Sequence, residues 1–219
     1  MNDFAAALAA MPLVAILRGV QPDAVEAIGE ELVGAGFTLI EVPLNSPDPF
    51  RSVERLARRF AGRALIGAGT VLTVADLNRV RDAGGQMVIS PNTDPAVIRA
   101  SVEAGMASLP GYFTPSEAFA ALAAGASALK LFPAEAATPA VLKAQRAVLP
   151  REIPILVVGG VTPDRMASWR AAGADGFGLG SALYAPGRTA AEVGASAAEF
   201  VSALRTGKSG FATGAGEVG

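Results

Sequence analysis

Two charged side chains interrupt apolar stretches that otherwise predict buried strands. Lys130 stands in Ala-Leu-Lys-Leu-Phe, and Glu41 stands in Leu-Ile-Glu-Val-Pro-Leu. Burying an ammonium or a carboxylate is costly, so each needs a reason to be there. The reason can be structural, with Lys130 reaching solvent from a strand end or Glu41 pairing with Lys130 or Arg18. It can also be chemical, because burial frees a lysine amine to form an imine and a nearby carboxylate then carries protons.

The absence of two residue types narrows the chemistry. The sequence of 219 residues has no Cys and no His. This excludes a thiolate nucleophile, a Ser–His–Asp triad, and metals bound by Cys or His. Acid–base and nucleophilic work must therefore fall to Lys, Glu, Asp, Tyr, Ser or Thr, and the only lysines are Lys130, Lys143 and Lys208.

Groups that can bind anions follow other predicted strands. Arg18 ends Ala-Ile-Leu-Arg, and it is either a surface residue at a strand end or a bidentate clamp for a carboxylate. Gly159-Gly160 and Gly180-Ser181 follow two later apolar runs. Such pairs are common in turns, but they also expose backbone N–H groups to a phosphate. The chain has no G-x-x-x-x-G-K-[ST] motif, which counts against a P-loop nucleotidase.

The elements that must position these residues follow a repeating order. Continuous apolar runs alternate with amphipathic stretches, as in a parallel sheet buried on both faces. Eight such units predict an α/β fold, a (β/α)8 TIM barrel with a short N-terminal helix over residues 3–10; a doubly wound open sheet is the alternative. In such a barrel the chemistry lies at the carboxyl ends of the strands, and the last two loops hold phosphate. The predicted strands cover residues 14–17, 39–44, 65–69, 87–90, 107–110, 128–132, 155–158 and 176–179.

Capping residues beside proline mark the predicted helix starts, and Ala-Gly pairs mark several helix ends. The starts are predicted at Pro22-Asp23, Ser46-Pro47, Asp94-Pro95, Thr114-Pro115, Thr138-Pro139 and Thr162-Pro163.

Composition and charge exclude several classes of protein. Hydrophobic residues make up 51% and charged residues 17% of the chain, unlike a disordered protein. A net charge of −2 lacks the basic footprint of a nucleic-acid binder. The apolar run over residues 4–17 is split by Pro12 and has no basic residue before it, so we expect no membrane span, no signal peptide and a cytoplasmic protein. We expect one domain over residues 1–206 and a Gly-rich, disordered tail over residues 207–219.

Six short motifs occur in one order along the chain. They are AILRG at 15–19, IEVPLNSP at 40–47, IGAGTV at 66–71, SPN at 90–92, ALKLFP at 128–133 and VGGV at 158–161. Together they resemble the KDPG/KHG aldolase family over residues 5–205. The resemblance implies a metal-independent class I aldolase without a cofactor, built on a (β/α)8 barrel and assembled as a homotrimer. Its substrate would be a small-molecule 2-keto-3-deoxy sugar acid phosphate.

The resemblance also implies a role for each matching residue. Lys130 would form the Schiff base and Glu41 would be the general acid/base. Asn45 departs from the Arg of the phosphogluconate branch, which favours the branch that cleaves the phosphogalactonate epimer; cleavage of phosphogluconate or 4-hydroxy-2-oxoglutarate is the alternative. The pyruvate carboxylate would be bound by Arg18 and Thr70, the pocket lined by Pro91 and Phe132, and the phosphate held by Gly159, Gly160, Gly180 and Ser181.

Two rival functions follow from the same fold. A ribulose-phosphate epimerase type of enzyme uses metal-binding His, which this chain lacks. A non-catalytic barrel that binds a sugar phosphate would keep the glycine pairs, but it would not need both Lys130 and Glu41.

Overall fold

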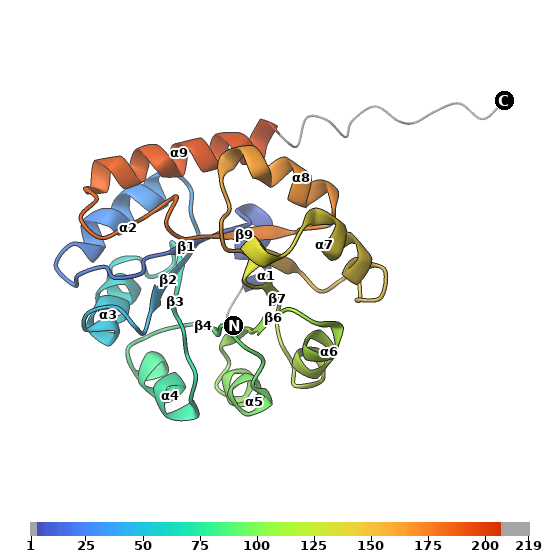
Figure 1. Cartoon of the computed structure of the whole chain (residues 1–219). Coiled ribbons are helices and arrows are strands. Elements are labelled where there is room, and N and C mark those ends of the chain that lie inside the picture. Colours follow the sequence, from blue (N-terminus) through green and yellow to red (C-terminus); the bar gives the residue numbers. More distant parts are fainter. Residues whose placement is uncertain (1–3, 207–219) are drawn as a thin grey trace.

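The computed structural model describes residues 4–206 and shows parallel strands arranged in a ring with helices outside it (Figure 1). Neighbouring strands are hydrogen-bonded in the order β5-β4-β3-β2-β1-β9-β8-β7-β6. The strands are β1 (Leu13–Ile16), β2 (Leu39–Pro43), β3 (Leu65–Gly69), β4 (Met87–Ile89), β5 (Ala107–Leu109), β6 (Gly111–Tyr112), β7 (Leu129–Leu131), β8 (Ile155–Val158) and β9 (Gly176–Leu179).

The described residues form nine strands rather than the eight predicted because proline divides the fifth strand of the barrel. Pro110 separates β5, which pairs with β4, from β6, which pairs with β7. Backbone hydrogen bonds join this broken strand to both neighbours: Gly111 N donates to Ser90 O at 3.0 Å, and Lys130 N donates to Pro110 O at 2.9 Å. The ring therefore closes here, which confirms the predicted barrel and excludes the open sheet.

Helices surround the ring and connect successive strands (Figure 1). Thr114 and Glu117 form a reciprocal capping box at the start of α6, and Asp94 and Thr138 cap α5 and α7 through their side chains, as predicted. The helices are α1 (Phe4–Ala10), α2 (Val25–Gly34), α3 (Pro49–Arg59), α4 (Val74–Asp82), α5 (Pro95–Glu103), α6 (Pro115–Ala123), α7 (Pro139–Arg146), α8 (Met166–Ala171) and α9 (Ala190–Thr206), with 3-10 turns at Ala134–Ala136 and Pro163–Arg165.

The predicted helix start at Ser46-Pro47 is wrong, and its correction matters for the site. The Ser46 hydroxyl does not cap a helix; it accepts the N–H of Gly19 at 2.9 Å and so joins the loops after β1 and β2. Helix α3 begins only at Pro49, after Asp48 with a φ of 38°. Smaller shifts occur at α2, which begins at Val25, and at the Thr162-Pro163 start, which opens a 3-10 turn before α8.

Apolar side chains form two layers of core. The larger cluster lies between the strands and the surrounding helices, and the smaller one fills the barrel interior. Along β1 the layers alternate: Leu13 and Ala15 belong to the outer cluster, while Val14 and Ile16 belong to the interior one. Phe4 and Leu8 of α1 join the interior cluster, so the N-terminal helix closes one end of the barrel (Figure 1).

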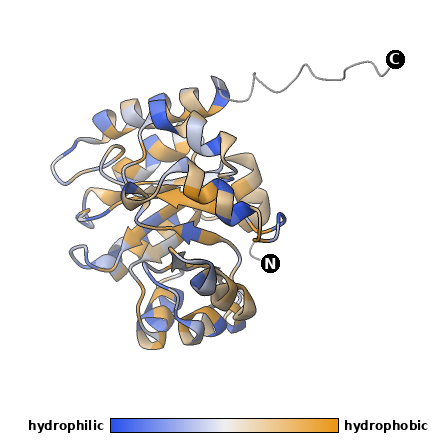
Figure 2. Ribbon diagram, turned by 45° about the vertical axis from the view of Figure 1, so that its right-hand side comes forward, coloured by the Kyte–Doolittle hydropathy of each residue, from blue (hydrophilic) through white to orange (hydrophobic). Residues whose placement is uncertain are grey.

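Hydropathy follows this layering. The strands are mostly hydrophobic, whereas the helices alternate between hydrophobic and hydrophilic residues (Figure 2). Within residues 4–206, none of the helices is both long enough and apolar enough to span a bilayer. The predicted tail over residues 207–219 lies outside the described residues.

Candidate active site

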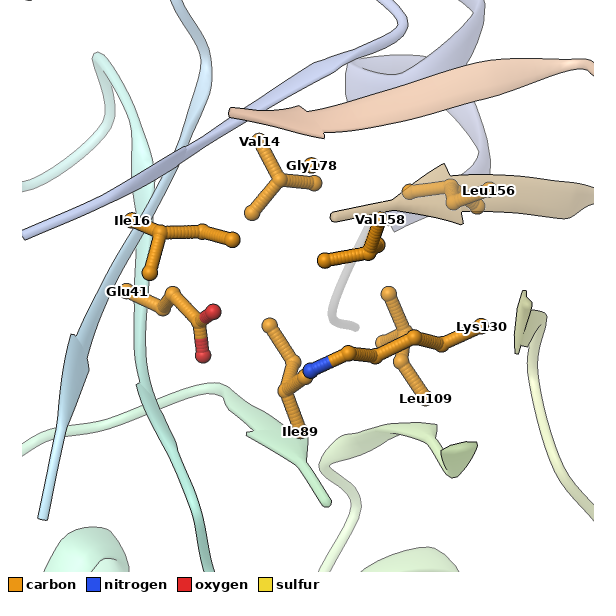
Figure 3. A pocket seen from close by; sticks show the side chains of 9 residues that line it. All are labelled: Val14, Ile16, Glu41, Ile89, Leu109, Lys130, Leu156, Val158 and Gly178. Atoms are coloured by element: carbon orange, nitrogen blue, oxygen red, sulfur yellow. The ribbon is translucent and has the colours of Figure 1, made fainter. Parts of the chain in front are cut away.

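Glu41 and Lys130 enter the barrel interior from β2 and β7. Their positions follow from strand alternation, because Leu39 and Ala128, each two residues earlier, also face the interior. The two polar side chains project into one space from different walls of the barrel (Figure 3). The remaining wall of this inner pocket is apolar, from Val14, Ile16, Ile89, Leu109, Leu156, Val158 and Gly178.

Burial moves the proton equilibria of both groups toward their neutral forms. Glu41 is 2% exposed and Lys130 is 6% exposed. Desolvation raises the pKa of the Glu41 carboxyl, against the opposing charges of Lys130 and Arg18. Desolvation also lowers the pKa of the Lys130 ammonium, and the attraction of Glu41 only partly offsets it. A neutral amine is a nucleophile and a protonated carboxyl can give up a proton, so the pocket holds a matched donor and nucleophile.

The structure does not support the structural ion pair as the reason for these two residues. In the part of the chain that the structure describes, Glu41 forms no ion pair with Lys130 or with Arg18, and Glu41 Oε2 is buried without a hydrogen-bond partner. Lys130 Nζ instead lies 4.8 Å from the centroid of the Phe132 ring. A buried polar atom without a partner costs stability, and such atoms cluster at functional sites.

A glycine in β3 makes room for the carboxylate of Glu41. A Cβ added at Gly69 would overlap Glu41 Oε2, so only glycine leaves space for this side chain. Gly67 and Gly69 face β2 in register with Glu41 and Pro43. Gly69 belongs to the motif IGAGTV, and its place at the carboxyl end of a predicted strand is the only signal in the sequence for this role.

The loops after β1 and β2 hold Arg18 in place. Arg18 Nη1 donates to Asn45 Oδ1 at 2.7 Å, and the Ser46–Gly19 hydrogen bond ties the two loops together beside it. Arg18 and Asn45 are both exposed, so the guanidinium keeps further donors for a ligand. The role of Ser46 was missed because its hydroxyl resembled a helix cap in the sequence.

Thr70 and Pro91 lie at the carboxyl ends of β3 and β4 and are partly exposed. Thr70 adopts a φ of 57°, which a β-branched residue rarely tolerates. Ser90, next to Pro91, donates its hydroxyl to Val71 O at 2.7 Å and so ties the two loops together. Both residues lie on the predicted face, but neither lines the inner pocket or the cavity beside it.

A second cavity of about 190 Å³ adjoins the inner pocket and contains the remaining predicted residues. Ile16 and Val158 line both spaces. Gly159 and Gly160 have φ values of 113° and 60°, which favour glycine over any residue with a side chain. Glu135 and Thr162 also line this cavity, and neither was predicted as a site residue. The predicted residues that line this outer cavity are Arg18, Phe132, Gly159, Gly160, Gly180 and Ser181.

The described residues contain no group of three or more Asp or Glu side chains that could hold a metal ion. The polar groups of the two cavities are thus an amine, carboxylates, a guanidinium, hydroxyls and backbone N–H groups. These groups can perform imine chemistry, proton transfer and anion binding.

Comparisons with known proteins agree with this geometry. The family model "KDPG and KHG aldolase" matches residues 5–192. The chain belongs to the KDPG and KHG aldolase family. The predicted resemblance is therefore confirmed.

Individual relatives of this family member carry a more specific name. The chain is 52% identical to a "Probable 2-dehydro-3-deoxy-6-phosphogalactonate aldolase" of Rhizobium meliloti (strain 1021), over 83% of this chain and 86% of the relative. It is 45% identical to the 2-dehydro-3-deoxy-6-phosphogalactonate aldolase of Escherichia coli (strain K12), over 89% and 95% of the two chains. A solved structure described as native KDPGal matches with a TM-score of 0.90 and 44% identity, over 91% of this chain and 97% of that one.

Proposed function

We propose that this protein is a class I aldolase that cleaves 2-dehydro-3-deoxy-6-phosphogalactonate to pyruvate and D-glyceraldehyde 3-phosphate. The observation that carries the proposal is the buried pair of Lys130 and Glu41 in one apolar pocket, each shifted toward its neutral form. The names of the relatives support the choice of substrate.

The mechanism follows from the protonation states of the pair. The neutral Lys130 amine attacks the C2 ketone of the substrate, and the carboxyl of Glu41 supplies and removes protons while the carbinolamine loses water. The resulting iminium accepts the electron pair of the C3–C4 bond as that bond breaks. Glu41 takes the proton of the C4 hydroxyl, so the aldehyde leaves and an enamine remains on Lys130. Protonation of the enamine at C3 and hydrolysis of the imine release pyruvate and restore the amine.

The two ends of the substrate are anions, and the outer cavity offers groups for both. Arg18, which lines this cavity, can pair with the carboxylate in a bidentate manner. We assign Thr70, which lies outside the cavity at the carboxyl end of β3, to the same end of the substrate because of the family resemblance. The phosphate fits the backbone N–H groups of the Gly159-Gly160 turn together with Gly180 and Ser181. Pro91 and Phe132 would border the pyruvyl part of the substrate.

Asn45 is the residue that we assign to the choice of C4 epimer. The galactonate and gluconate substrates differ at the C4 hydroxyl, which is the group that Glu41 deprotonates. Asn45 follows β2 four residues after Glu41 and accepts a hydrogen bond from Arg18, which lines the outer cavity, so its amide lies beside a residue of that cavity. An amide offers both a donor and an acceptor, unlike the guanidinium of an Arg.

The assembly and location of the enzyme belong to the same proposal. We propose a homotrimer in the cytoplasm that needs no metal or cofactor. Exposed apolar side chains on three successive helices, Val102 of α5, Phe119 of α6 and Val141 of α7, support self-association. Mass measured by light scattering in solution tests the trimer.

Borohydride trapping with pyruvate tests the central step. We expect one reduced pyruvyl group on the peptide that contains Lys130, and we expect that a chelator leaves activity unchanged. Lys130→Met should abolish the label, whereas Lys143→Met, a variant of a lysine on the outer helix α7, should retain it. Labelling of Lys143 or Lys208 instead would contradict the role of Lys130 and overturn the proposal. Binding of the sugar phosphate without any imine would also overturn it, and would favour a non-catalytic barrel.

A further inference from the structure

A carboxylate that the mechanism does not use lies on the glycines of the outer cavity. Glu135 is in the 3-10 turn Ala134–Ala136, five residues after Lys130. A Cβ at Gly159 would overlap Glu135 Oε2, and a Cβ at Gly160 would lie 2.8 Å from Glu135 Cγ. Glu135 also lines the outer cavity with Arg18, Gly180 and Ser181. Its side chain therefore occupies space beside the groups proposed to bind phosphate.

Among the described residues, Glu135 has no basic partner in an ion pair. Across residues 4–206, no Lys or Arg forms an ion pair with this carboxylate, and it accepts no hydrogen bond. The guanidinium of Arg18 in the same cavity is instead bonded to Asn45. The negative charge of Glu135 thus acts on any second anion that enters the cavity.

We infer that Glu135 is a specificity-determining residue that opposes the phosphate of the substrate at the Gly159-Gly160 turn. This inference rests on the proposed function. A phosphate on these glycines meets the carboxylate both as a bulky neighbour and as a like charge, so the Glu135 side chain must turn outward when the phosphate binds. This steric and electrostatic opposition weakens the binding of phosphorylated ligands, whereas the binding of a 2-keto-3-deoxy acid without phosphate is unaffected. Glu135 therefore reduces the advantage of phosphorylated over unphosphorylated substrates.

The test compares two substitutions with a matched control. Glu135→Gln removes the charge and keeps the shape, and Glu135→Ala removes both. Glu152→Gln makes the same change of net charge at an exposed residue that precedes β8, at the opposite end of the barrel. The affinity of each protein for inorganic phosphate is measured by calorimetry, which does not depend on catalysis.

For a like charge a few ångströms from a divalent anion near solvent, we expect both Glu135 variants to bind inorganic phosphate about five- to thirtyfold more tightly. The kcat/KM for the phosphorylated substrate should rise by a similar factor through KM, while that for the unphosphorylated acid stays within about twofold, the scale of a minor surface effect. Glu152→Gln should match the wild type in all three measurements.

An unchanged or weaker affinity for phosphate in both Glu135 variants would overturn the inference. It would also be overturned if Glu152→Gln gave the same gain, because the effect would then come from net charge alone. Borohydride trapping with pyruvate on the same proteins separates this result from the proposed function, since pyruvate carries no phosphate. Absence of trapping in the wild type would contradict the aldolase proposal. Trapping in the wild type, together with an unchanged phosphate affinity in the Glu135 variants, would contradict only the role of Glu135.

Discussion

Replacing Glu41 with Gln should separate the catalytic role of this carboxyl from its effect on stability. The amide keeps the shape of the side chain, which fits against Gly69, but it can neither ionise nor carry a proton. Because general acid–base catalysis contributes about 10²–10⁴ to a rate, kcat/KM should fall by that factor. Part of the imine trapping with pyruvate should survive, because Lys130 itself is unchanged.

The same substitution should change how stability depends on pH. Burial raises the pKa of the Glu41 carboxyl in the folded protein, so the folded state favours the protonated form. The stability that this group contributes is fully present below its ordinary pKa and is lost as the pH rises through the folded value. The Gln side chain does not ionise, so the variant lacks this loss of stability. The Tm of Glu41→Gln minus the Tm of the wild type should therefore be more positive at about pH 8 than at about pH 4. A tenfold change in this proton equilibrium corresponds to about 1.4 kcal/mol of stability, or about 3–6 °C in Tm for a protein of this size.

The assays are release of pyruvate under steady-state conditions and thermal melts at the two pH values. Comparing the melts between pH values removes the fixed cost of burying an amide. Glu54→Gln is the control, since Glu54 is exposed on the neighbouring helix α3. Cleavage by Glu41→Gln at nearly the wild-type rate would make Glu41 a structural residue. A Tm difference that did not change with pH would contradict the assigned direction of its pKa shift.

Three further substitutions test other parts of the site. Gly69→Ala forces a methyl group against the carboxylate of Glu41, so kcat should fall, and overpacking should lower the free energy of unfolding by about 1–3 kcal/mol in denaturant melts. The control is Gly34→Ala, at the end of α2 with open space around it, which should lower neither kcat nor the free energy of unfolding. Ser181→Ala should raise the KM for the phosphorylated substrate by about fivefold, the effect of one hydrogen bond, and an equal change for the unphosphorylated acid would contradict a phosphate contact. The wild type should favour the galactonate epimer by at least about tenfold in kcat/KM, and Asn45→Arg should narrow this preference; equal cleavage of both epimers by the wild type would remove Asn45 from the choice of substrate.

The fold was predictable because each unit of the barrel carries its own local signals. The apolar runs, the capping residues Asp94, Thr114 and Thr138, and the Ala-Gly helix ends are all determined by neighbouring residues in the sequence. The errors arose where a distant contact competed with a local one. Ser46 resembles a helix cap, but the N–H of Gly19 takes its hydroxyl, and Pro110 divides a strand whose two parts pair with different neighbours.

The site was predictable where a residue type conflicts with its surroundings, and it was not where the conflict exists only in three dimensions. Lys130 and Glu41 stood out because charges rarely occur in buried strands. Glu135 gave no such signal, since an exposed glutamate in a turn after a strand is ordinary in a sequence, and only the structure shows it against Gly159 and Gly160. No local pattern relates residue 135 to residue 159, because the parallel pairing of β7 with β8 is what brings the loops after these two strands together.

Strand register decides whether this chemistry exists at all. Glu41 and Lys130 lie two residues beyond Leu39 and Ala128, which fill the barrel interior, so both polar groups continue an inward-facing row. A shift of one residue in β2 would turn Glu41 toward the helices and bring Ile40 or Val42 into the pocket. The pairing of Glu41 with Gly67, and of Pro43 with Gly69, fixes that register and also places the glycine that admits the carboxylate. The small residues of β3 therefore serve the same reaction as the amine on β7, because without them the proton carrier could not occupy the interior of the barrel.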